Sequence, residues 1–199
     1  MIEHFNITGF FYTKMGFKCR KYLDIKHKSS HLIRPDIMVI MMNPGSSYPI
    51  DGIDDNTKTS ETVPDKTQNQ IMKVMINTSY NYARILNLSD LRTAKSKDLF
   101  SFIKSYESNN FPHSIFNPLR EKDLDKLIIK GAPVIFAWGV DNILIDLAKL
   151  AAKSINYTTP VGLQKPGRQF AYYHPLPRIY EKQVTWVNKI SEILMKQRM

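Results

Sequence analysis

Short, continuous apolar runs alternate with segments of helical periodicity along most of the chain. Four runs are typical of buried strands, and they are DIMVIMM (36–42), YARILNL (82–88), APVIFAWG (132–139) and QFAYYHP (169–175). Because these runs are apolar throughout rather than at every second position, they predict strands that are covered on both faces, as in a parallel sheet.

Five further segments carry apolar residues at helical spacing, and they are 65–80, 96–108, 120–131, 140–154 and 181–197. Asp65 or Thr67 is a candidate cap for the first helix, and Gly131 is a natural end for the third. Strands that alternate with helices predict an α/β fold, which we expect to be a three-layer α/β/α arrangement around a central, mainly parallel four-stranded sheet. The length of 199 residues predicts a single domain over residues 1–199.

The composition is that of a folded protein with an excess of positive charge. Hydrophobic residues make up 43% and charged residues 23%, which excludes wholesale disorder. Lys and Arg outnumber Asp and Glu by 28 to 18, so the formal charge is +10. This charge favours a polyanionic partner, nucleic acid first and an anionic membrane surface second. A basic surface without such a partner is the alternative, because the charges are spread along the chain.

The residue types that hold metals or form disulfides are scarce. Cys19 is the single cysteine, which excludes an intrachain disulfide or a cysteine-based zinc site and fits a reducing cytoplasm. The five histidines are scattered, and DGIDDNTKT (51–59) departs from the spacing of a calcium loop, so we expect no metal and no cofactor. No stretch approaches the roughly 20 apolar residues that a membrane span requires, so we expect a soluble, cytoplasmic protein.

Each predicted strand ends in a chemically specific group. These groups are Asn43-Pro44-Gly45, Asn87, Trp138-Gly139 and His174-Pro175. The carboxyl ends of parallel strands meet at one edge of a sheet, where two amides and an imidazole could hold a planar molecule such as a nucleobase. The structural alternatives are an ordinary Asn-Pro-Gly turn, a loop histidine, a core tryptophan and an asparagine that binds loop backbone.

Four motifs in this order resemble the uracil-DNA glycosylase superfamily, and they are MMNPGSS, ILNLSDLRT, VIFAWGVDN and YYHPLPR. The chain is equally similar to a bacterial and phage domain-of-unknown-function family, number sixteen forty-three. That resemblance also takes in Asp65-Lys66-Thr67 and extends over about residues 20–190. Met41 and Leu176 stand where the glycosylase motifs usually have glycine and serine.

The glycosylase resemblance implies a role for each matching residue. Asn43 would position the attacking water, and His174 would donate a hydrogen bond to the departing base. Pro44, Gly45, Tyr48 and Asn87 would contact the substrate, with Asn87 on the pyrimidine edge and Tyr48 stacked on the base. Ser46, Leu176 and Arg178 would contact DNA. Asp65 and Thr67 have no evident role in a glycosylase but match the other family, and they could cap a helix or face the pocket, which Trp138 could also border. An amide is no general base, so slow turnover is expected.

The resulting expectation is a protein that recognises a base in DNA and hydrolyses the N-glycosidic bond of uracil or a modified pyrimidine. A non-catalytic nucleic-acid or nucleotide-binding module is one alternative, and an enzyme that acts on a free nucleotide is another. Lysine and arginine around the predicted site would favour DNA, whereas a closed pocket without a basic rim would favour a small molecule. The loop GLQKPGRQ (162–169) lacks the pattern of a triphosphate cradle and is a candidate phosphate-contacting turn.

Overall fold

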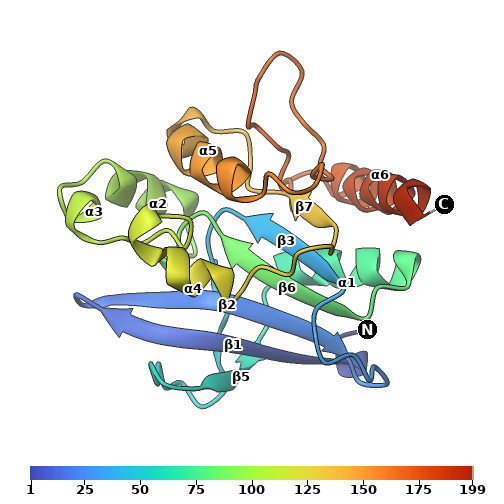
Figure 1. Ribbon diagram of the computed structural model, residues 1–199, viewed down its shortest axis with the longest axis horizontal. Helices are drawn as coiled ribbons and strands as arrows, with labels where there is room; N and C mark the ends of the chain where they lie inside the picture. Colours follow the sequence, from blue (N-terminus) through green and yellow to red (C-terminus); the bar gives the residue numbers. More distant parts are fainter. Residues whose placement is uncertain (199) are drawn as a thin grey trace.

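A seven-stranded mixed sheet forms the centre of the computed structural model, which describes residues 1–198 (Figure 1). The strand order is β4-β5-β1-β2-β6-β3-β7. The strands are β1 (Phe5–Lys14), β2 (Phe17–His27), β3 (Ile37–Met41), β4 (Tyr48–Pro49), β5 (Thr59–Val63), β6 (Tyr82–Asn87) and β7 (Val134–Phe136).

The two longest strands form an N-terminal hairpin that the sequence analysis did not predict. Met15 and Gly16 connect β1 to β2 with φ angles of 52° and 79°, as a two-residue hairpin turn requires. The register between the strands shifts at Phe10 and Phe11, where Lys21 is left without a partner, so the hairpin carries a β-bulge. Buried and more exposed residues alternate along β1, a pattern that a search for continuous apolar runs misses.

The prediction of a central, mainly parallel four-stranded sheet is wrong. Only β6, β3 and β7 run parallel to one another, while the hairpin pairs antiparallel with β6 and with β5, and β4 pairs antiparallel with β5. The predicted strand at 169–175 forms only isolated bridges through Tyr172. Phe170 has a φ of 59°, which is incompatible with an extended strand, and Pro175 has no backbone N–H to donate to a ladder.

Helices lie on both faces of the parallel part of the sheet, and they are α1 (Lys66–Thr78), α2 (Ser96–Ile103), α3 (Glu107–Asn110), α4 (Glu121–Asp125), α5 (Ile145–Ser154) and α6 (Tyr180–Arg198). The helices predicted at 65–80 and 181–197 are confirmed as α1 and α6. The predicted helix at 96–108 is divided into α2 and α3, and 120–131 is helical only in α4 and the 3₁₀ turn before it.

Two apolar cores hold these layers together. On one face, Ile85 and Val39 of the sheet pack with α1 and α6, which also contact each other. On the other face, Met38 and Leu86 pack with α2, α4 and α5. Among the described residues, no helix is long and apolar enough to span a membrane.

Candidate functional site

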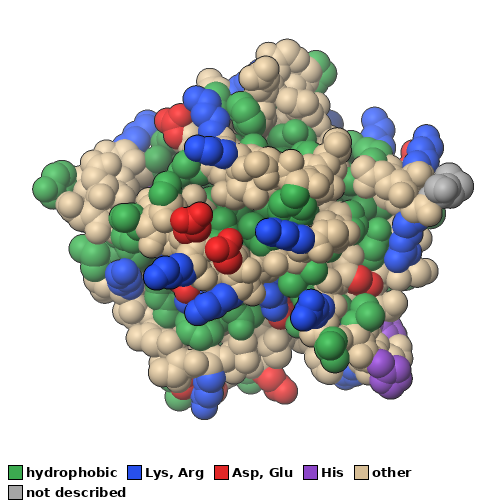
Figure 2. All heavy atoms as spheres, in the orientation of Figure 1, with side chains coloured by type: hydrophobic (Ala, Val, Ile, Leu, Met, Phe, Trp, Pro, Cys, Tyr) green, Lys and Arg blue, Asp and Glu red, His purple; other side chains and the backbone are tan. Residues whose placement is uncertain are grey.

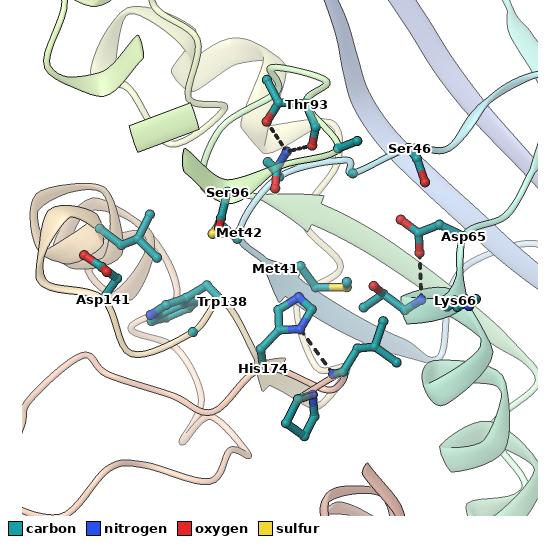
Figure 3. Close-up of a pocket in the computed structure, with 18 of the residues that line it drawn as sticks. Met41, Met42, Ser46, Asp65, Lys66, Thr93, Ser96, Trp138, Asp141 and His174 are labelled. Carbon is teal, nitrogen blue, oxygen red and sulfur yellow. Dashed lines mark hydrogen bonds between the residues drawn. The ribbon is translucent and has the colours of Figure 1, made fainter. Parts of the chain in front are cut away.

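A cavity of about 850 Å³ opens where β3 and β7 end and α1 begins (Figure 3). Its walls come from five stretches of the chain, within residues 41–46, 64–67, 93–100, 138–144 and 174–178. Ligand sites of α/β sheets lie beyond the carboxyl ends of parallel strands, and a volume of this size is sufficient for a nucleotide.

Asn43 is held in one orientation at the end of β3. Its Nδ2 donates to the carbonyl oxygens of Leu91 and Thr93, at 3.3 and 2.8 Å, and lies 3.0 Å from Thr93 Oγ1. These contacts use the donors of the amide, whereas Oδ1 accepts no hydrogen bond from any residue in the range 1–198. Asn43 therefore offers the cavity a hydrogen-bond acceptor.

The carboxylate of Asp65 lies against the turn that follows Asn43. Its Oδ1 accepts the backbone N–H groups of Thr67 and Gln68, at 2.8 and 3.3 Å, and so caps α1. A Cβ atom added to Gly45 would collide with Asp65 Oδ2, so only glycine, which also has a φ of 66° here, fits this approach. Oδ2 has no hydrogen-bond partner within residues 1–198, and Asp65 borders the cavity.

His174 presents a neutral imidazole to the same cavity. Burial lowers the pKa of His174 to about 4, although the carboxylate of Asp65 partly opposes this shift. Nδ1 accepts the backbone N–H of Leu176 at 3.2 Å, so the proton of the neutral ring is on Nε2. Figure 3 shows the ring of His174 pointing into the cavity with Trp138 and Asp65 on either side. Nε2–H is thus a fixed donor without a positive charge.

Trp138 forms a rigid wall of the cavity. It is fully buried, and its Nε1 donates to the carbonyl oxygen of Phe170 at 2.7 Å. Its ring packs on Phe136, with a centroid distance of 4.5 Å, and edge-on to Tyr172 at 5.2 Å. The core interpretation of Trp138 therefore holds, and the residue borders the cavity as well.

Arg20 of β2 contacts the Asn-Pro-Gly turn from the protein interior. The sequence analysis did not identify this residue. Its guanidinium is fully buried, and Nη1 donates to Ser47 Oγ and to the carbonyl oxygen of Pro44, the latter at 3.4 Å. Burial lowers the pKa of Arg20 to about 10, and Asp65 acts in the opposite direction. No local motif signals this arginine, because the bulge in β2 decides which face it occupies.

The rim of the cavity carries charges of both signs. Lys66 and Arg178 border it, both are exposed, and neither forms an ion pair within residues 1–198. The exposed carboxylate of Asp141 borders it as well. Ser46 and Leu176 lie on the same rim. Over the face in Figure 2, by contrast, lysine and arginine side chains are dispersed rather than gathered in one stripe. Within the described chain, no group of three or more His, Cys, Asp or Glu could hold a metal ion.

Three residues expected at the site do not border the cavity. Tyr48 is exposed on β4, and Pro44 is buried, with its carbonyl oxygen turned toward Arg20. Asn87 is fully buried at the end of β6, and neither polar atom of its amide has a partner in the part of the chain that the structure describes. The other nine, including Asn43, Asp65 and His174, border one cavity.

A comparison with protein families gives one match, which is described as "Protein of unknown function (DUF1643)" and covers residues 25–176. The matched region contains the Asn-Pro-Gly turn, Asp65, Trp138 and His174, and it ends within the loop that forms the rim. No curated protein and no solved structure matches the chain significantly.

Proposed function

The chain belongs to this family of unknown function, and we propose that its cavity receives a nucleobase of a nucleic acid and hydrolyses the N-glycosidic bond. One observation carries the proposal. The same cavity is lined by the neutral imidazole donor of His174, the amide acceptor of Asn43 and the carboxylate of Asp65. The motifs shared with uracil-DNA glycosylases support the same chemistry.

His174 acts on the leaving group. When the glycosidic bond breaks, its electron pair stays with the base, and negative charge develops on a ring nitrogen and on the exocyclic carbonyl oxygen next to it. The Nε2–H of His174 donates a hydrogen bond to that oxygen, which stabilises the departing anion without transfer of a full proton. A ring that already carried its proton on Nδ1 would lose the bond from Leu176, so the neutral tautomer is fixed in place.

Asn43 and Asp65 act on the water and the sugar. Asn43 Oδ1 accepts a hydrogen bond from the water, and Asp65 Oδ2 takes its proton as the oxygen attacks the anomeric carbon. The carboxylate also stabilises the positive charge that develops on the sugar as the bond to the base breaks. Asp65 thereby supplies the general base that the amide of Asn43 cannot be.

The two unpaired cations at the rim favour a substrate that is part of a polymer. Lys66 and Arg178 are free to bind backbone phosphates on either side of the base. The rim loop is held to α6, because Gln183 Nε2 donates to the carbonyl oxygen of Pro177 at 2.7 Å. Leu176 is therefore fixed at the opening, where an apolar side chain can occupy the space that a flipped base leaves.

The test is release of base from labelled oligonucleotides that carry uracil, hydroxymethyluracil or a mismatch, in single- and double-stranded form. Wild type is compared with His174→Ala, and His31→Ala is the control because His31 is exposed and outside the cavity. Release that is lost only in His174→Ala supports the proposal. Binding without release would reduce the function to base recognition. The absence of both binding and release would refute the nucleic-acid proposal.

A further inference from the structure

A second cavity of about 760 Å³ lies beside the first. It lies between the loop at 162–166 and one face of α6, and it shares Gly139, Val140, His174 and Pro177 with the main cavity. In Figure 1 this loop lies between α5 and α6 and extends away from the sheet. Because four residues border both cavities, the two lie side by side, and a strand bound at one is within reach of the other. We refer to the second cavity as the side groove.

The walls of the side groove are held in place by hydrogen bonds. Trp186 of α6 is buried, and its Nε1 donates to the carbonyl oxygen of Tyr173 at 3.0 Å. The backbone N–H of Tyr173 in turn donates to the carbonyl oxygen of Leu163 at 2.8 Å. The helix, the Tyr173 segment and the loop therefore form one connected wall, so the groove is a preformed surface.

The side groove carries positive charge and no carboxylate. Lys182, Thr185, Trp186 and Lys189 line it from α6, at the spacing of one helix face. Both lysines are exposed, and neither pairs with a carboxylate within residues 1–198. Seven residues at 1.5 Å each separate them by about 10.5 Å along the helix, so they would bind different phosphates.

An aromatic ring lies beside these charges. Tyr173 borders the groove and is 42% exposed, while its backbone is fixed on both sides. Pro166 lines the opposite wall, and its loop also contains Lys165 and Arg168. Positive charge along a groove with an aromatic surface is the chemistry that binds single-stranded nucleic acid, in which phosphates contact lysines and bases stack on rings.

We infer that the side groove binds the nucleotides that flank the base in the main cavity, with their phosphates on Lys182 and Lys189 and a base stacked on Tyr173. This inference rests on the proposed function, and it specifies the substrate as a single strand of nucleic acid rather than a free nucleotide. The candidate phosphate-contacting turn at 162–169 then forms one wall of the strand-binding groove.

The test measures binding of a labelled single-stranded oligonucleotide that carries 2′-fluoro-deoxyuridine, whose glycosidic bond resists hydrolysis. Binding is followed by fluorescence anisotropy across a series of salt concentrations. The variant Lys182→Gln/Lys189→Gln is compared with Lys126→Gln/Lys196→Gln, which removes the same charge from exposed lysines outside the groove. For two lost phosphate contacts, the slope of log K against log salt should fall by about 1.4 in the groove variant only.

The ring of Tyr173 is tested in the same assay. Tyr173→Ala should weaken binding about tenfold or more, whereas Tyr173→Phe keeps the stacking surface and should bind as wild type does. Equal slopes for the two double variants, with wild type still binding, would overturn the inference about the side groove. The proposed function of the main cavity would be unaffected. Hydrolysis of a free nucleoside as fast as of an oligonucleotide would do the same. Absence of any binding by wild type would overturn both proposals.

Discussion

Replacement of His174 by asparagine tests whether the imidazole is neutral, as the proposed chemistry requires. Asparagine can still accept the backbone N–H of Leu176, but it does not titrate. The pKa of His174 is about 4 in the folded protein, against an ordinary value of 6.5. Between these values the unfolded chain binds a proton that the folded protein does not, so acidification must lower the free energy of unfolding.

The magnitude follows from the size of the shift. A difference of 2.5 pKa units corresponds to about 3.4 kcal/mol, which is present above pH 6.5 and lost completely below pH 4. Over the accessible range from pH 7.5 to pH 5, the loss is about 2 kcal/mol. Because His174 is only partly buried and keeps some contact with solvent, this figure is an upper value.

The assay is urea unfolding of wild type and His174→Asn at pH 7.5 and pH 5. The variant should lose about 2 kcal/mol less stability on acidification than wild type. His113, whose pKa burial also lowers to about 4, contributes in the same direction in both proteins. Asp90, whose pKa burial raises to about 6, contributes in the opposite direction in both. The comparison therefore isolates His174, with His31→Asn as the exposed control. Parallel pH profiles for wild type and His174→Asn would refute the lowered pKa of His174.

Three further predictions concern the turn, the helix cap and the sheet. Asp65→Asn should keep the cap of α1 but lower base release by at least about 100-fold, measured in single turnover. Asp65→Ala should in addition lose about 1 kcal/mol of stability relative to Asp65→Asn, measured by urea unfolding, because alanine cannot cap the helix. Gly45→Ala should destabilise by about 1 kcal/mol more than Gly16→Ala in urea unfolding, because both have positive φ but only a Cβ at position 45 meets a neighbour, Asp65. Arg84→Ala should cost about 3–5 kcal/mol, because it leaves the buried carboxylate of Asp24 without the bidentate partner that binds it at 2.7 and 2.8 Å. The double variant with Asp24→Asn should cost less than the sum of the single changes; additive losses would contradict this account.

Strong local signals allowed the parallel strands and the long helices to be predicted. β3 is apolar at every position and lies in the middle of the parallel strands, and α1 has a capping box that its sequence encodes. The hairpin of β1 and β2 escaped prediction, because β1 alternates in burial, the bulge interrupts the pattern of β2, and the partners of both strands are partly distant in sequence. The sheet is therefore mixed rather than mainly parallel.

The candidate site was predictable where a residue follows a strand and not where strand geometry decides its direction. Asn43 comes two residues after β3 ends, and the turn carries it to the cavity. Asn87 is still within β6 and faces the same side as Ile85, which belongs to the core beside α1. Its amide is therefore buried on the face of the sheet that packs with α1. No motif around position 87 could reveal this placement.

The bulge in the hairpin makes the turn at Asn43 dependent on the strand register elsewhere in the chain. Leu23 and Ile25 belong to the core beside α1, so without the bulge the odd-numbered Cys19 would face that side too. Cys19 instead packs in the opposite core, and Arg20 points toward Pro44 and Ser47. Loss of the bulge at unchanged chain length would exchange the two side chains, placing a thiol under the turn and a guanidinium among apolar residues. Deletion of Lys21, the unpaired residue, would instead restore a regular ladder and leave Arg20 and Cys19 on their present faces. The support of the Asn43 turn is thus set by how β1 and β2 pair, in a strand that does not border the cavity.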